Sequence, residues 1–99
     1  MAGEKKIEDQ IKKHLKQRGA YFIKVHGNAY MKKGIPDILA CYRGHFLGIE
    51  VKDIGKKPSE QQVIHIDNIN IAGGTAFYTD NLQEVVNVLD RIDYEMDKW

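Results

Sequence analysis

Hydrophobic residues recur at helical spacing near the two ends of the chain and alternate with polar residues in its middle. Ile7, Ile11 and Leu15 stand four residues apart, which predicts an amphipathic helix over about residues 4–18. A similar stripe over residues 82–92 predicts a last helix, capped by Asp80 or Asn81.

The middle of the chain is predicted to form a set of short strands. Alternation or short apolar runs predict strands over residues 21–26, 35–42, 45–52 and 75–79. Between the last two, Ser59 and Gln62 have the spacing of a capping box and open a helix that runs to Gly73. The expected order is therefore αβββαβα, an α/β fold in which helices flank a small mixed sheet.

The central two strands form the most informative segment. If Arg43-Gly44 is a two-residue hairpin loop, Tyr42 faces His45 and Asp37 lies directly opposite Glu50. Two opposed carboxylates repel each other, so the arrangement suggests a cation between them.

Strand alternation brings a lysine to the same patch, because Asp37, Glu50 and Lys52 share one face at the open end of the hairpin. Hard carboxylate ligands suit Mg²⁺ or Mn²⁺, and a metal-activated water with a nearby lysine is suited to phosphodiester hydrolysis. The plainer interpretation is a surface hairpin in which Lys52 or another base neutralises the acids.

Two further polar residues lie on the flanking helices. Glu8 lies along the apolar stripe of the first helix, either at its edge in water or facing a positive charge, and is the natural additional carboxylate. Gln62 either completes only the capping box or also contacts a substrate phosphate or the attacking water. Its neighbour Gln61 is an alternative for that role.

Charge is divided unevenly along the chain. Residues 1–57 carry 13 Lys/Arg and 6 Asp/Glu, whereas residues 58–99 carry 2 and 8. A basic half that also holds the acid pair suggests nucleic acid as partner, although lysines on the first helix also simply solvate it. The candidate nucleic-acid contacts are Lys24, Lys32, Lys33, Lys56 and Lys57.

Size and composition set the remaining limits. The 99 residues fit one domain, residues 1–99. The one cysteine, Cys41, excludes an intrachain disulfide and is expected to be a small buried residue. Neither a signal peptide nor a membrane-spanning run is recognisable, so we expect a cytoplasmic protein without membrane contact.

These residues resemble a known family. The segments Gly34-Ile35-Pro36-Asp37 and Glu50-Val51-Lys52 are similar to the PD-(D/E)xK nuclease signature, and specifically to its VRR-NUC branch in the small phage and bacterial form. Glu8, the pattern Ser59-x-x-Gln62 and Gly73-Gly74 extend the resemblance from about residue 4 to residue 89. The resemblance implies a restriction-endonuclease-like core of the element order given above.

The resemblance also implies an activity, namely that of an Mg²⁺- or Mn²⁺-dependent endodeoxyribonuclease. Asp37, Glu50 and the backbone carbonyl of Val51 would bind metal, with Glu8 direct or through water. Lys52 would activate the nucleophile, and Gln62 would support phosphate or water. Small members of the branch are similar to Holliday junction resolvases, which act as homodimers on branched DNA.

Two questions remain open at the level of the sequence. A catalytically inactive nucleic-acid-binding module with a nuclease fold is the alternative to the enzyme. The C-terminal residues Tyr94, Met96 and Trp99 either cover the core of the monomer or form the interface of a homodimer.

Overall fold

The computed structural model describes residues 2–27 and 31–98. In chain order the elements are α1 (Ala2–Gln17), β1 (Tyr21–Lys24), β2 (Ile38–Tyr42), β3 (His45–Val51), α2 (Glu60–Ile71), β4 (Thr75–Thr79) and α3 (Leu82–Asp97). This is the αβββαβα order expected from the sequence. Within the described ranges, none of the helices has the length and apolar character needed to cross a membrane.

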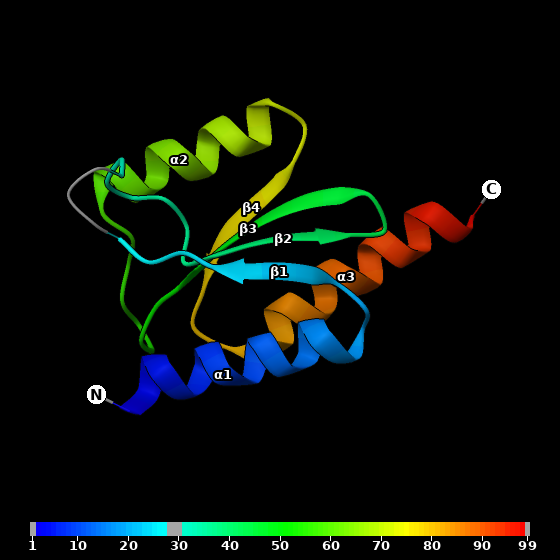
Figure 1. Ribbon diagram of the computed structural model, residues 1–99, viewed down its shortest axis with the longest axis horizontal. Helices are drawn as coiled ribbons and strands as arrows, with labels where there is room; N and C mark the ends of the chain where they lie inside the picture. Colours follow the sequence, from blue (N-terminus) through cyan, green and yellow to red (C-terminus); the bar gives the residue numbers. More distant parts are fainter. Residues whose placement is uncertain (1, 28–30, 99) are drawn as a thin grey trace.

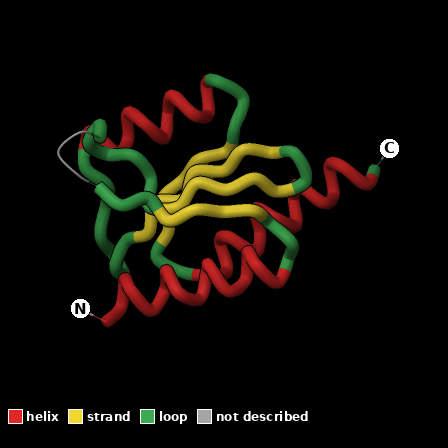
Figure 2. The backbone as a smooth tube through the Cα atoms, in the orientation of Figure 1, coloured by secondary structure: helices red, strands yellow, loops and turns green. Residues whose placement is uncertain are grey.

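The four strands form one mixed sheet in the order β1-β2-β3-β4. Neighbours are antiparallel except β3 and β4, which are parallel. Two parallel strands need a crossover connection, and α2 supplies it on one face of the sheet. Helices α1 and α3 lie side by side on the other face (Figure 1), and the layers separate clearly in the backbone tube (Figure 2).

The hairpin between β2 and β3 has the predicted register. Tyr42 pairs with His45 and Ile38 with Ile49. The loop residues Arg43 and Gly44 both have positive φ, 49° and 85°, as a type I′ turn requires. The ladder begins at Ile38 and not at residue 35, because Pro36 has no N–H to donate.

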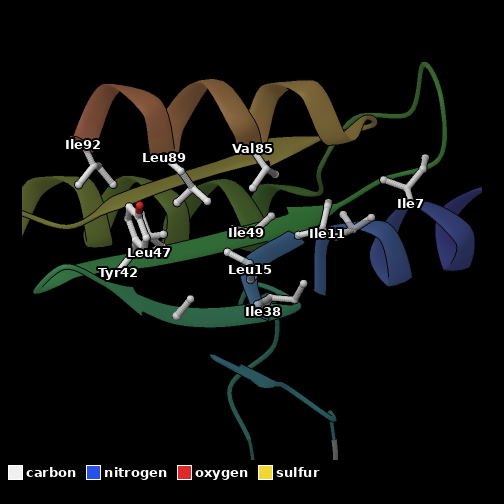
Figure 3. Packing of buried hydrophobic residues seen from close by; sticks show 12 residues of the cluster. Ile7, Ile11, Leu15, Ile38, Tyr42, Leu47, Ile49, Val85, Leu89 and Ile92 are labelled. Carbon is white, nitrogen blue, oxygen red and sulfur yellow. The ribbon is translucent and has the colours of Figure 1, made fainter. Parts of the chain in front are cut away.

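The hydrophobic core fills the space between the sheet and the α1/α3 layer. Ile11, Leu15 and Leu89 from the two helices are fully buried against Leu47 and Ile49 of β3. Figure 3 shows these side chains meeting between the elements. The apolar residues of the helices and of the strands therefore pack together in one layer. Burying each large apolar side chain stabilises the fold by about 1.5–3 kcal/mol.

An ionic cluster fastens the closed end of the hairpin to the helices. Asp93 of α3 accepts hydrogen bonds from Tyr42 Oη at 2.8 Å, from Arg43 at 2.9 Å and from Arg18 at 2.8 Å. The guanidinium of Arg18 also lies 5.7 Å from the centre of the Tyr42 ring. These contacts fix the position of the turn, and the open end of the hairpin is restrained with it.

On the other face of the sheet, α2 covers only the β3–β4 half. The Asn70 side chain donates to the Ala76 carbonyl and accepts from its N–H, at 2.9 and 2.8 Å. Gly48 permits the close approach, because a Cβ there would lie 2.9 Å from Ile69 Cδ1. The β1–β2 half is left uncovered.

The uncovered half carries apolar side chains, which we call the outer apolar face: Tyr21, Ile23, Leu39, Cys41 and Phe46. Direct pairing of Tyr21 with Cys41 and of Cys41 with Phe46 places them on one side of the sheet. The prediction that Cys41 is buried is wrong, since its side chain is exposed. Alternation correctly placed Cys41 on the same face as Leu39, but no helix or strand of the described residues covers that face.

Tyr94 and Met96 do not cover the core. Tyr94 is 68% exposed and Met96 is 42% exposed, both near the end of α3. Trp99 lies outside the described residues. Of the two roles expected for these residues, covering the monomer's core is therefore excluded for Tyr94 and Met96.

Gly34 controls how the loop before β2 meets the start of α2. Its φ is +88°, and a Cβ on it would lie 2.6 Å from the backbone carbon of Gln61. Backbone atoms cannot rotate away as a side chain does, so only glycine permits this contact.

We therefore predict that Gly34→Ala lowers the free energy of unfolding by about 3 kcal/mol or more, through the strained φ and the backbone clash together. Urea unfolding measures this loss. Gly44→Ala is the matched control: it has φ +85° but no atom within 4 Å of the added Cβ, so it should cost only about 1–2 kcal/mol. Equal losses in the two variants would contradict the clash.

Candidate active site

Two carboxylates meet at the open end of the hairpin. Glu50 is the last residue but one of β3 and only 2% exposed, and Asp37 immediately precedes β2. Asp37 is held by its backbone carbonyl, which accepts from Val25 N at 2.7 Å, and by Oδ2, which accepts from Val51 N at 2.9 Å. Asp37 and Glu50 therefore lie opposite each other, as predicted, one position beyond the Ile38–Ile49 pair of the β2–β3 ladder.

Glu50 is strongly perturbed by this environment. Burial and then the negative charge of Asp37 raise the pKa of Glu50 to about 8, and Lys52 only partly offsets them. Its Oε2 accepts from Gln62 Nε2 at 2.9 Å, whereas its Oε1 is buried and has no hydrogen-bond partner among the described residues. A buried acceptor without a donor is costly unless something else binds it.

Lys52 lies beside this pair. Its Nζ is 3.6 Å from Glu50 Oε2, and its side chain is 19% exposed. Its backbone N–H donates to the Thr79 carbonyl at 2.9 Å, so the residue is fixed just beyond the last pair of β3 and β4. Strand alternation therefore predicted correctly that Glu50 and Lys52 share a face.

Gln62 completes the capping box and also contacts Glu50, while its expected contact with phosphate or water stays a prediction. Its Oε1 accepts from Ser59 N at 2.8 Å and its N–H donates to Ser59 Oγ at 3.2 Å, which completes the capping box. The same amide reaches Glu50 through Nε2. Of the two glutamines, it is Gln62 that contacts the acid pair.

Glu8 arrives from α1 and is 7% exposed. Its Oε1 accepts from Lys24 Nζ at 2.8 Å, and its Oε2 lies 3.2 Å from Lys12 Nζ. Burial opposes the charged form, but hydrogen bonds and charge from the two lysines outweigh it and lower the pKa of Glu8. Lys24 also lies 3.6 Å from Asp37 Oδ1, so it links the two acids.

Lys12 and this role of Lys24 were missed by the sequence reasoning. Lys12 follows Glu8 by four residues, which is the ordinary spacing of a helical ion pair. Lys24 pairs with Ile38, the neighbour of Asp37, but that pairing between separate strands is not readable from local pattern.

The predicted nucleic-acid contacts are distributed around the site. Lys32 and Lys33 line a cleft of about 260 Å³ together with Gly34, Ile35 and Asp37. Lys56 and Lys57 are exposed in the loop between β3 and α2. Lys24 lies within the acid cluster itself.

The donor set fits one hard divalent cation. Among the described residues, no group of three or more His, Cys, Asp or Glu side chains is gathered tightly enough to hold a metal. Mg²⁺, however, commonly takes only one or two protein carboxylates and completes its shell with water and phosphate. The opposed Asp37 and Glu50, with the unpartnered Glu50 Oε1, match that requirement.

The raised pKa of Glu50 predicts a pH dependence of stability. The pKa of Glu50 is about 8 in the folded protein, against an ordinary 4.5. The contribution of this carboxyl to the free energy of unfolding is therefore fully present below pH 4.5 and is lost as pH rises through about 8. In EDTA, we expect the free energy of unfolding of the wild type to fall by a few kcal/mol relative to that of Glu50→Gln between about pH 5 and pH 9. The expected loss is on the order of 1.4 kcal/mol per pKa unit. Parallel urea-unfolding curves for the two proteins over this range would contradict the prediction.

Comparison with known proteins places this arrangement in a family. The family model described as archaeal Holliday junction resolvase (Hjc) matches residues 2–81, which include all five predicted site residues. A search of curated proteins finds no match.

Two solved structures share the fold. One, described as a VRR_NUC domain, is 22% identical with a TM-score of 0.74, over 89% of this chain and 95% of that one. The other is Hjc from Archaeoglobus fulgidus, described as a Holliday junction resolvase from an archaeal hyperthermophile. It is 23% identical with a TM-score of 0.56, over 75% of this chain and 64% of that one. The expected restriction-endonuclease-like fold is confirmed, and the chain belongs to the Hjc family of Holliday junction resolvases.

Proposed function

We propose that this protein is an endonuclease that uses Mg²⁺ or Mn²⁺ to hydrolyse phosphodiester bonds in branched DNA, with the Holliday junction as the leading substrate. The observation that carries the proposal is the buried Glu50 carboxylate, which faces Asp37 and has one oxygen without a partner. A protein that only bound DNA would gain nothing from placing a buried acid opposite a second one. Membership of the Hjc family supports the choice of substrate.

Asp37, Glu50 and the backbone carbonyl of Val51 are the residues that would hold the cation. A divalent ion there would supply Lewis acidity toward the phosphate and a lowered pKa for bound water. The chain supplies the rest: Asp37 is fixed through Val51 N, and Gln62 fixes Glu50 Oε2. Glu8 remains a proposed additional acid, acting through the lysines that it binds.

Lys52 is the proposed electrostatic catalyst. Its ammonium group lies 3.6 Å from Glu50 Oε2 and is partly exposed, so it can face a phosphate approaching the acid pair. There it would stabilise negative charge that grows on the phosphate oxygens and orient the attacking water. Gln62 would assist through the amide that already borders the site.

The DNA backbone would approach along the basic loops. Lys32 and Lys33 line the cleft that leads to Asp37, and Lys56 and Lys57 follow the Lys52 strand. Each lysine that neutralises a phosphate releases a counterion, so binding should weaken as salt rises. The acidic half, residues 58–99, lies mainly on α2 and α3 and is less suited to the duplex.

We also propose that the active form is a homodimer that pairs through the outer apolar face. One chain offers one acid pair, whereas symmetric resolution of a four-way junction needs two cuts related by two-fold symmetry. The five residues of this face carry no charge and border an apolar hollow of about 280 Å³, so the face suits another protein surface and does not suit DNA. Single exposed apolar residues are ordinary, but a contiguous patch indicates an interaction site.

Cleavage of labelled DNA tests the activity. With four-way junction, flap, single-stranded and duplex substrates, we expect cutting of the junction in Mg²⁺ or Mn²⁺ and none in EDTA. Lys52→Ala should bind the junction normally but cut it about 100-fold more slowly or worse, and Asp37→Asn and Glu50→Gln should be at least as impaired.

Lys13→Ala is the matched control. It removes one exposed lysine from a side of α1 away from Glu8, so the variant should cut at the wild-type rate. Binding without metal-dependent cutting by wild type would instead assign the chain as an inactive DNA-binding module. Equal rates for Lys52→Ala and Lys13→Ala would remove Lys52 from its role.

Sedimentation tests the dimer. Phe46 is 46% exposed on the β3 side of the outer apolar face, so Phe46→Glu should convert a micromolar dimer into monomer through the cost of burying a charge. Tyr94→Glu, on the exposed end of α3, should leave the dimer intact. Dissociation by Tyr94→Glu alone would move the interface to α3, and a monomeric wild type would exclude the dimer.

A further inference from the structure

One lysine lies between two acids of the site. Lys24 at the end of β1 places Nζ 2.8 Å from Glu8 Oε1 and 3.6 Å from Asp37 Oδ1. Its side chain is 27% exposed, and those of Glu8 and Asp37 are 9% and 24% exposed. The ammonium group is thus partly enclosed between α1 and the start of β2.

The oxygens of these acids are already engaged. Both oxygens of Glu8 face ammonium groups, Oε1 that of Lys24 and Oε2 that of Lys12. Asp37 Oδ2 accepts from the Val51 N–H, so Oδ1 is the atom that faces Lys24. The acid oxygen of the site with no partner among the described residues belongs to Glu50, on the other side of Asp37.

An ammonium group and a metal ion hold two carboxylates at different separations. Mg²⁺ holds its oxygen ligands at about 2.0–2.1 Å, which would draw two bridging carboxylates together. Hydrogen bonds from an ammonium group span about 2.8 Å or more and leave the carboxylates further apart. Lys24 Nζ, 2.8 Å from Glu8 Oε1 and 3.6 Å from Asp37 Oδ1, is the cation that lies between these two carboxylates.

We propose that Lys24 is a positioning residue that serves as a built-in cation: it neutralises Glu8 and Asp37 where a second divalent ion would otherwise bind. The site then takes one metal ion per chain, between Asp37 and Glu50. This inference rests on the proposed metal-dependent function. It assigns Glu8 to holding Lys24 and not to direct metal binding.

Manganese binding without DNA tests the inference independently of activity. Titration of the protein with Mn²⁺, with free ion counted by electron paramagnetic resonance, should give one ion per chain for wild type. Lys24→Met should bind a second ion and hold the first about tenfold more tightly, since a like charge near Asp37 is gone. Circular dichroism verifies that the variant is folded.

Three variants isolate the cause. Lys24→Arg keeps the charge and should bind one ion. Lys12→Met removes the other partner of Glu8 but leaves Lys24 in place, so it should also bind one. Glu8→Gln added to Lys24→Met should return the count to one, because it removes the acid that completes the second site.

The outcomes separate this inference from the proposed function. Two ions bound by wild type, or one ion with unchanged affinity in folded Lys24→Met, would overturn the role of Lys24 and leave the nuclease proposal standing. No Mn²⁺ bound by wild type at millimolar concentration would overturn the metal-dependent function, and the role of Lys24 with it.

Discussion

The candidate site depends on one constraint, the approach of two carboxylates at the open end of a hairpin. Asp37 and Glu50 are brought together by the backbone ladder, whose register is fixed at the other end by the turn at Arg43-Gly44. Burial and the negative charge of Asp37 raise the pKa of Glu50 to about 8, so ionisation of Glu50 is unfavourable in this fold. A cation bound between Asp37 and Glu50 would relieve that cost, and the rest of the site is organised around the same pair.

Surrounding elements supply opposite charges and hydrogen bonds from several directions. Helix α2 begins at a capping box whose Gln62 also reaches Glu50, so helix formation and site assembly use one side chain. Helix α1 contributes Glu8, which holds Lys24 against Asp37. The α1 contact thus adds a positive charge to one side of the pair, and the α2 contact adds a hydrogen bond to the other.

The two faces of the sheet have different roles. The face toward α1 and α3 is closed by the core and, at the turn, by the Asp93 cluster with Arg18 and Arg43. The opposite face is only half covered by α2; its uncovered half carries the uncharged surface around Phe46, whereas the basic cleft lies beside Asp37. A protein of this size can therefore offer DNA one edge and a second copy another surface.

The sequence by itself determined the element order, the hairpin register and the convergence of Asp37, Glu50 and Lys52, because helical and strand periodicity and a two-residue turn are local rules. It also located Gln62, since a capping box is read within four residues. Tertiary structure alone decided that Cys41 is exposed and that Lys24 links Glu8 to Asp37. Those outcomes depend on which helix covers which half of the sheet and on which strand pairs beside β2, and such long-range packing leaves no signal in a local pattern.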